Sequence, residues 1–197
     1  MLQRTWRSLV SAIEGPRSIG GLGAAVGGFA LLTAAALYVL HVGGGPAGLM
    51  SLGYAGVFLM MVISGGTVFL PVPGPPAIMA AGAILNPALV GIAAGFGNAT
   101  GEITSYATGW AASSILEKRG DARLVAFLAR WLESWGFLAI LTLAAIPNPI
   151  FHLMSALAGA TGYPARRFWL ACALGNCLKY GAFAYLGATA STLLLHW

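Results

Sequence analysis

Three ionisable residues lie inside long apolar stretches of the sequence: Glu102, His152 and Lys179. A charge held within a bilayer is costly, so residues of this kind usually face a partner, a cavity or a transport path. Glu102 and Lys179 each follow a Gly-Asn pair at nearly the same distance, so their helices could bring them together. We consider a structural ion pair, a polar lining for a headgroup or proton path, and one side chain extending to the membrane surface.

His152 follows a Pro147-Asn148-Pro149 motif that must interrupt a helix, because proline lacks a backbone donor. Its ordinary pKa near neutrality would allow proton coupling, although a lone histidine is also explained as a structural hydrogen-bonding residue. Asn148 lies at the break itself and could orient a polar group of a ligand.

Two further asparagines, Asn98 and Asn176, lie in apolar helices and are also candidates for the lipid path, although hydrogen bonding between helices is the simpler role for them. Cys172 and Cys177 face different sides of one helix, so neither a disulfide nor a metal site is expected. No serine or cysteine has a credible acid–base partner, and no phosphate-binding loop is present. The sequence therefore predicts neither an enzyme nor a cofactor.

The composition predicts an integral membrane protein, because 58% of the residues are hydrophobic, 8% are charged and the mean hydropathy is +0.83. Soluble domains carry about 25% charged residues. The net charge of +5 does not indicate nucleic-acid binding, since the basic residues form short clusters beside apolar segments, as on the cytoplasmic side of membranes. We expect a cytoplasmic segment over 1–18 and one membrane domain over 19–197.

Two similar units repeat along the chain, and each contains a hydrophobic stretch broken by prolines and followed by an apolar helix. The arms beside the breaks are too short to span a bilayer, so re-entrant hairpins are expected over about 49–86 and 136–162. The prolines at the breaks are Pro73, Pro75, Pro147 and Pro149.

Membrane-spanning helices are expected over 19–42, 88–113 and 168–195, the first of them too long for the apolar region of a signal peptide. Between the units, leucines and tryptophans recur at helical spacing over 123–135, which predicts an amphipathic helix in the membrane surface. Placing all basic clusters on the cytoplasmic side gives the two units opposite orientations. The fold class is thus all-α, an inverted repeat of a re-entrant hairpin plus a transmembrane helix.

The chain resembles the DedA/VTT (SNARE-associated) membrane protein superfamily, closest to its vacuole-membrane-protein branch. The matching features are Pro73-Gly74-Pro75, the pattern Gly-Glu-x-x-x-Tyr-x-x-Gly over 101–109, and the segment 146–159. The resemblance covers about 49–187. It implies two facing re-entrant hairpins and translocation of phospholipids or polyprenyl-phosphate carriers, with Glu102 at the family's acidic position.

This chain departs from the family pattern at three places. Pro75 stands where many bacterial members have an acidic residue, and His152 stands where the vacuole-membrane type commonly has aspartate. Arginines common around the second hairpin are missing. These differences favour a passive lipid path over a proton-driven mechanism that clamps phosphate.

We therefore expect a lipid translocator in a bacterial inner (plasma) membrane with a cytoplasmic N-terminus. Its partners would be membrane lipids, either phospholipid or polyprenyl phosphate, and homo-oligomers are possible, whereas nucleic acid is not expected. A proton-coupled transporter of a small solute is one alternative. A scaffold without transport activity, docking through the helix over 123–135, is another.

Overall fold

The computed structural model describes residues 52–66, 74–118, 122–148 and 150–195, and within these ranges every regular element is an α-helix, as predicted. The helices are α4 (Tyr54–Gly66), α5 (Gly74–Ile84), α6 (Pro87–Lys118), α7 (Ala122–Ala145), α8 (Phe151–Ala160) and α9 (Ala165–Leu195). The predicted segments over 1–18 and 19–42, and the prolines Pro73 and Pro149, lie outside the described residues.

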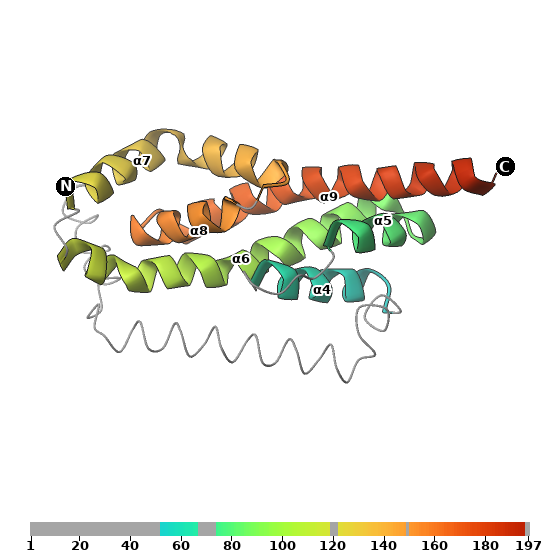
Figure 1. Ribbon diagram of the computed structural model, residues 1–197, viewed down its shortest axis with the longest axis horizontal. Helices are drawn as coiled ribbons and strands as arrows, with labels where there is room; N and C mark the ends of the chain where they lie inside the picture. The colour runs from blue at the N-terminus through green and yellow to red at the C-terminus, as the bar shows by residue number, and fades with distance from the viewer. Residues whose placement is uncertain (1–51, 67–73, 119–121, 149, 196–197) are drawn as a thin grey trace, which may run out of the picture.

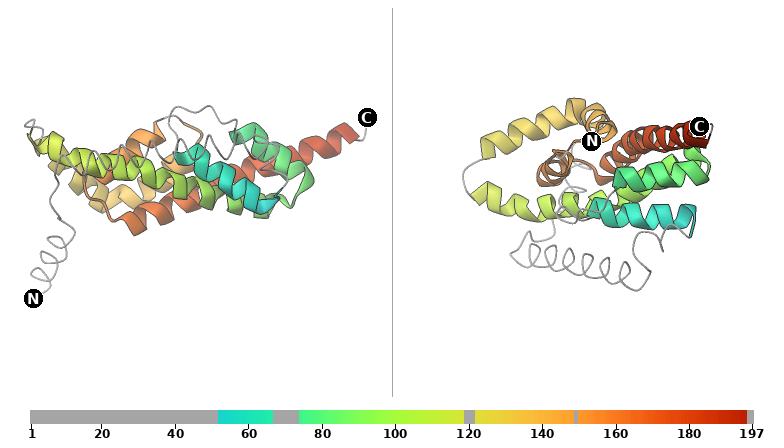
Figure 2. Two further views of the ribbon diagram at one scale, coloured as in Figure 1. Left: turned by 90° about the horizontal axis from the view of Figure 1, so that it is seen from below. Right: turned by 45° about the vertical axis from the view of Figure 1, so that its right-hand side comes forward.

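The two longest helices, α6 and α9, pack against each other along the long axis of the molecule (Figure 1). Helices α4 and α5 lie toward one end of this pair, and α7 and α8 lie toward the other (Figure 2). Helix α4 packs on α6 and α7 packs on α9, each within its own unit, whereas α5 packs mainly on α9 and α8 mainly on α6. The second short helix of each unit therefore crosses to the long helix of the other.

Glycines form both crossings in the same way. A glycine of the long helix meets the backbone of the short helix, and a glycine of the short helix meets the backbone of the long one, so a Cβ at any of them would overlap backbone atoms. Small residues at such positions let helices approach closely. The pairs are Gly109 with Ala156 and Gly159 with Tyr106 between α6 and α8, and Gly187 with Met79 and Gly82 with Ala184 between α9 and α5.

The described prolines at the predicted breaks lie at helix ends. Pro75 lies in the first turn of α5, where a missing backbone donor removes no helical hydrogen bond. Pro147 follows the end of α7, and the side-chain amide of Asn148 donates to the carbonyls of Leu143 at 2.8 Å and Ile146 at 2.9 Å. Asn148 thus satisfies carbonyls at the end of α7 that the helix itself leaves without a partner.

The prediction of a separate amphipathic helix over 123–135 is wrong, because α7 continues as one helix from Ala122 to Ala145 and only changes direction along its length (Figure 1). Gly136, at the junction of the segments predicted over 123–135 and 136–162, is the residue there that least favours a helix. Glycine keeps its backbone donor and costs a helix about 1 kcal/mol, which packing can offset. A Cβ at Gly136 would press against the ring of Tyr163, so the glycine serves this contact.

The long helices expose many large apolar side chains, while several polar side chains are buried. Exposed large hydrophobic residues of α6 and α9 are Leu89, Ile92, Phe96, Ile103, Leu170, Leu174, Leu178, Tyr185, Leu186 and Leu193. Buried polar residues are Asn98, Glu102, Ser105, Ser113, Ser155 and Asn176. Many large apolar side chains exposed on two helices are typical of a contact with another apolar phase or protein.

Among the described residues, no helix combines the length and the apolarity needed to cross a membrane. The spans expected over 88–113 and 168–195 stay predictions.

The glycine crossings give the first testable prediction. Gly109→Ala places a Cβ against the carbonyl of Ala156 and is expected to destabilise the fold by about 1–3 kcal/mol, the usual cost of overpacking. Gly181→Ala is the matched control, because a Cβ there meets nothing within 4 Å. Thermal unfolding of the purified protein in detergent measures both variants. Equal melting temperatures for the two would contradict the packing described here.

Candidate functional site

The carboxylate of Glu102 is buried in α6 and is contacted by two side chains of α8. Ser155 Oγ donates a hydrogen bond to Glu102 Oε2 at 2.8 Å, and His152 Nδ1 lies 3.0 Å from Glu102 Oε1. Positions three residues apart lie on one face of a helix, so α8 presents both side chains to the same carboxylate. The crossing of α8 over α6 therefore builds the centre of this site.

The imidazole of His152 lies at ion-pair distance from the Glu102 carboxylate. His152 Nδ1 is 3.0 Å from Glu102 Oε1, and it has no well-aligned hydrogen-bond partner. The attraction between two full charges depends on their separation and much less on angle. A neutral imidazole carries no charge, so the ion pair requires a protonated His152.

Access to the pair is one-sided. Only 3% of the Glu102 side chain is exposed, against 29% of the His152 side chain. A proton or a polar ligand arriving from outside therefore meets the imidazole before the carboxylate.

The structural ion pair considered between Glu102 and Lys179 is not formed. The Lys179 ammonium lies 4.7 Å from the centroid of the Tyr180 ring, a cation–π contact, while Glu102 is held by α8. The two repeats show why. Glu102 comes four residues after Asn98, and four residues after Asn176 the chain has Tyr180 rather than Lys179. One residue turns a helix by about 100°.

Lys179 nevertheless belongs to the same site. Its charge interacts through space with the charges of Glu102 and His152. We call Glu102, His152, Ser155 and Lys179 the polar cluster; its members come from α6, α8 and α9. Ser155 was not predicted from the sequence, although its position three residues after His152 is a signal that could have identified it.

The asparagines expected at the site have different roles. Asn98 is buried against Gly65 of α4. The Asn176 amide nitrogen donates to Cys172 Sγ at 3.2 Å. Both residues belong to α9, so this hydrogen bond does not join two helices as predicted. Asn176 Oδ1 and Ser105 Oγ are buried without protein partners. Such atoms call for water or for polar atoms of a ligand.

The polar cluster has no polar counterpart at the other crossing. When the glycines of the two crossings are aligned, Gly109 with Gly187 and Gly159 with Gly82, Glu102 corresponds to Tyr180. In the same alignment Ser155 corresponds to Ile78. Tyr180 and Ile78 are both buried in one apolar cluster. The two units thus share a packing scheme, but only the crossing of α8 over α6 carries charge. Within the described ranges, no group of His, Cys, Asp or Glu side chains is arranged to hold a metal ion.

Comparison with known proteins places this site within a recognised domain. A family model described as the VTT domain matches residues 72–189, which include α5, α8 and every member of the polar cluster. None of the curated proteins and none of the solved structures compared with the chain matches it.

The buried pair gives a second prediction. His152→Ala leaves the Glu102 carboxylate without its cationic neighbour and is expected to destabilise the protein by roughly 2 kcal/mol, less than the loss for a wholly buried pair because the imidazole is partly exposed. Adding Glu102→Gln removes the unmatched charge, so the double variant should lose less stability than the two single losses combined.

Chemical unfolding in detergent at neutral pH measures the free energy of unfolding of the two single variants and the double variant. Ser113→Ala is the control, because this hydroxyl is buried in the same α6 helix but donates to the Trp110 carbonyl of its own helix. Losses that add without coupling would show that Glu102 and His152 do not interact.

Proposed function

The chain belongs to the VTT domain (DedA, SNARE-associated) family, whose proteins are membrane-associated, and from this we propose that it moves lipids between membrane leaflets. Phospholipid or polyprenyl-phosphate lipids would be its substrates. The observation that carries the proposal is the polar cluster, three ionisable side chains and a serine inside helices that expose many large apolar side chains. Such residues inside a membrane domain mark paths for ions or polar groups.

In this proposal α6 and α9 span the bilayer together as parts of the bundle, since neither is apolar enough along its length to cross it alone. They have 32 and 31 residues, and at a rise of about 1.5 Å per residue either is longer than a hydrocarbon core of about 30 Å. The exposed leucines, isoleucines and phenylalanine on their outer faces would contact lipid, while the buried polar residues face the bundle.

The short helices would form the two re-entrant hairpins, α4 with α5 and α7 with α8. Helices α5 and α8 have 11 and 10 residues, too few to cross a bilayer. The equivalent glycine crossings support an inverted repeat, in which each hairpin returns against the long helix of the other unit. Broken helices at membrane depth need protein or water around them, and the opposite unit supplies protein.

The chemistry of the polar cluster suits a phosphate-bearing headgroup. The Lys179 ammonium is a point charge on a flexible stem, and no carboxylate of the described residues holds it in an ion pair. It can therefore attract phosphate oxygens, while Glu102 and His152 balance each other nearby. The unpartnered oxygens of Asn176 and Ser105 could hold water beside the passing headgroup.

One observation favours a second candidate, a proton-coupled transporter of a small solute. The partly exposed imidazole against a buried carboxylate is a pair that could load and release a proton. In this mechanism protons drive transport, whereas a lipid translocator needs no gradient.

Vesicle reconstitution tests the leading proposal. Vesicles containing the protein should exchange a fluorescent phospholipid between leaflets faster than empty vesicles. Lys179→Gln should slow this exchange about tenfold, equivalent to roughly 1.4 kcal/mol on the barrier, because the phosphate loses its cationic contact. Ser113→Ala, which lies outside the polar cluster, should leave the rate unchanged. Exchange no faster than in empty vesicles would overturn the proposal.

A pH gradient separates the two candidates. Lipid exchange by a passive translocator should be the same with and without an inward proton gradient. Proton-coupled transport predicts instead that activity requires the gradient and disappears in Glu102→Gln, because the amide cannot take up a proton. Gradient-dependent activity that Glu102→Gln abolishes would replace the passive account.

A further inference from the structure

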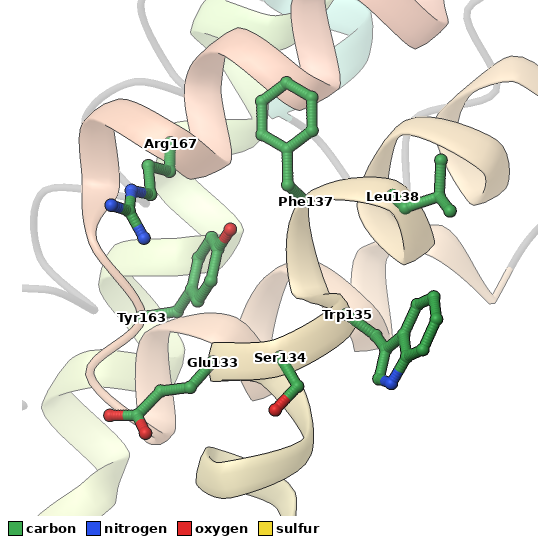
Figure 3. Close-up of a pocket in the computed structure, with 7 residues that line it drawn as sticks. All are labelled: Glu133, Ser134, Trp135, Phe137, Leu138, Tyr163 and Arg167. Atoms are coloured by element: carbon green, nitrogen blue, oxygen red, sulfur yellow. The ribbon is translucent and has the colours of Figure 1, made fainter.

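An open pocket of about 460 Å³ lies between α7 and the beginning of α9, outside the polar cluster. Its size falls within the range of about 300–1,000 Å³ that is usual for small-ligand sites. Charged, aromatic and aliphatic side chains line it together (Figure 3). Neither Glu102 nor His152 nor Lys179 is among them, so this is a second and separate place for a ligand.

Two opposite charges face the pocket. Glu133 comes from α7 and Arg167 from the first turn of α9, and the Tyr163 ring lies between their charged ends in Figure 3. Within the described part of the chain, these two side chains form no ion pair with each other. Both charges therefore remain available to a ligand that carries a cation and an anion of its own.

Tyr163 forms a fixed wall of this pocket. Gly162 follows the end of α8, its φ of 72° suits glycine, and Tyr163 N donates to the Ala158 carbonyl at 2.9 Å. The Tyr106 hydroxyl donates to the Tyr163 carbonyl, and the missing side chain of Gly136 leaves room for the Tyr163 ring. Burial raises the pKa of the Tyr163 hydroxyl, although the Arg167 charge acts in the opposite direction.

Ser134 adds a hydroxyl to the lining, and the other lining residues are apolar and exposed. Trp135, Phe137 and Leu138 of α7 line the pocket, and 59% of Trp135 and 56% of Leu138 are accessible. Tryptophan is enriched at the depth of lipid headgroups. A ligand in this pocket would thus meet charge at one part and hydrocarbon surface at another, as an amphiphile requires.

We propose that this pocket binds one zwitterionic phospholipid, with its phosphate at Arg167, its ammonium at Glu133 and an acyl chain along Phe137 and Leu138. Charge complementarity selects this occupant. An anionic headgroup would be repelled by Glu133, and a lipid without a charged headgroup would leave both charges without partners. The site goes beyond the proposed function, because it holds a lipid whether or not the protein moves one.

Native mass spectrometry of the full chain in detergent tests the proposal with three added lipids: phosphatidylethanolamine, phosphatidylglycerol and diacylglycerol. Phosphatidylethanolamine should bind most strongly. Arg167→Gln and Glu133→Gln should each weaken its binding about tenfold, the effect of one charge-assisted contact. Glu133→Gln should at the same time strengthen phosphatidylglycerol binding, since the repelling carboxylate is gone. A general loss of lipid affinity cannot produce these opposite changes.

Arg166→Gln is the matched control, because Arg166 is exposed in the same turn of α9 but does not line the pocket. Its phosphatidylethanolamine binding should equal that of the unmodified chain. The proposal fails if Arg166→Gln weakens binding as much as Arg167→Gln, or if Glu133→Gln leaves binding of both phospholipids unchanged. Soluble glycerophosphoethanolamine, added as a competitor, should displace little lipid, because it lacks the acyl chain. None of these readouts depends on lipid translocation, so the two proposals can fail separately.

Discussion

A carboxylate that is almost wholly buried must be matched by hydrogen bonds and opposite charge, and the Glu102 carboxylate imposes this requirement on three helices. Helix α6 carries it, and α8 supplies His152 and Ser155 from one face. Helix α9 contributes the longer-range charge of Lys179. Loss of a partner would leave a charge buried without compensation, which costs several kcal/mol in wholly buried pairs. The arrangement of these helices and the chemistry of the site therefore depend on each other.

Close backbone contact makes this arrangement possible. The glycine pair Gly109 and Gly159 brings α8 against α6, and Gly187 and Gly82 bring α5 against α9 in the same way. One packing scheme is thus used twice, but the second crossing is filled with apolar side chains. We infer that a polar group passing through the protein would meet charged side chains at the crossing of α8 over α6 and not at the crossing of α5 over α9. The repeated proline breaks in the sequence do not reveal this asymmetry.

Local sequence patterns predicted the helices and singled out Glu102 and His152, because buried ionisable residues and proline breaks are visible without a structure. Long-range packing decides what these patterns leave open. The structural ion pair considered between Glu102 and Lys179 does not form, because Lys179 lies one residue before the position equivalent to Glu102, which on a helix is about 100° of rotation. The separate helix expected over 123–135 is absent, because α7 continues through Gly136, whose missing side chain leaves room for the Tyr163 ring. Which helix crosses which cannot be read from either unit alone, and that choice creates the site.

We propose that a phospholipid headgroup reaches the polar cluster inside the protein. Photo-crosslinking measures this most directly, with a phospholipid carrying a photoreactive group on its headgroup and mass spectrometry to locate the adducts in reconstituted vesicles. We predict adducts on α8 and α9 beside Glu102, at or next to His152 and Lys179. Adducts confined to the exposed residues of α6, α7 and α9, with none at the polar cluster, would contradict the claim.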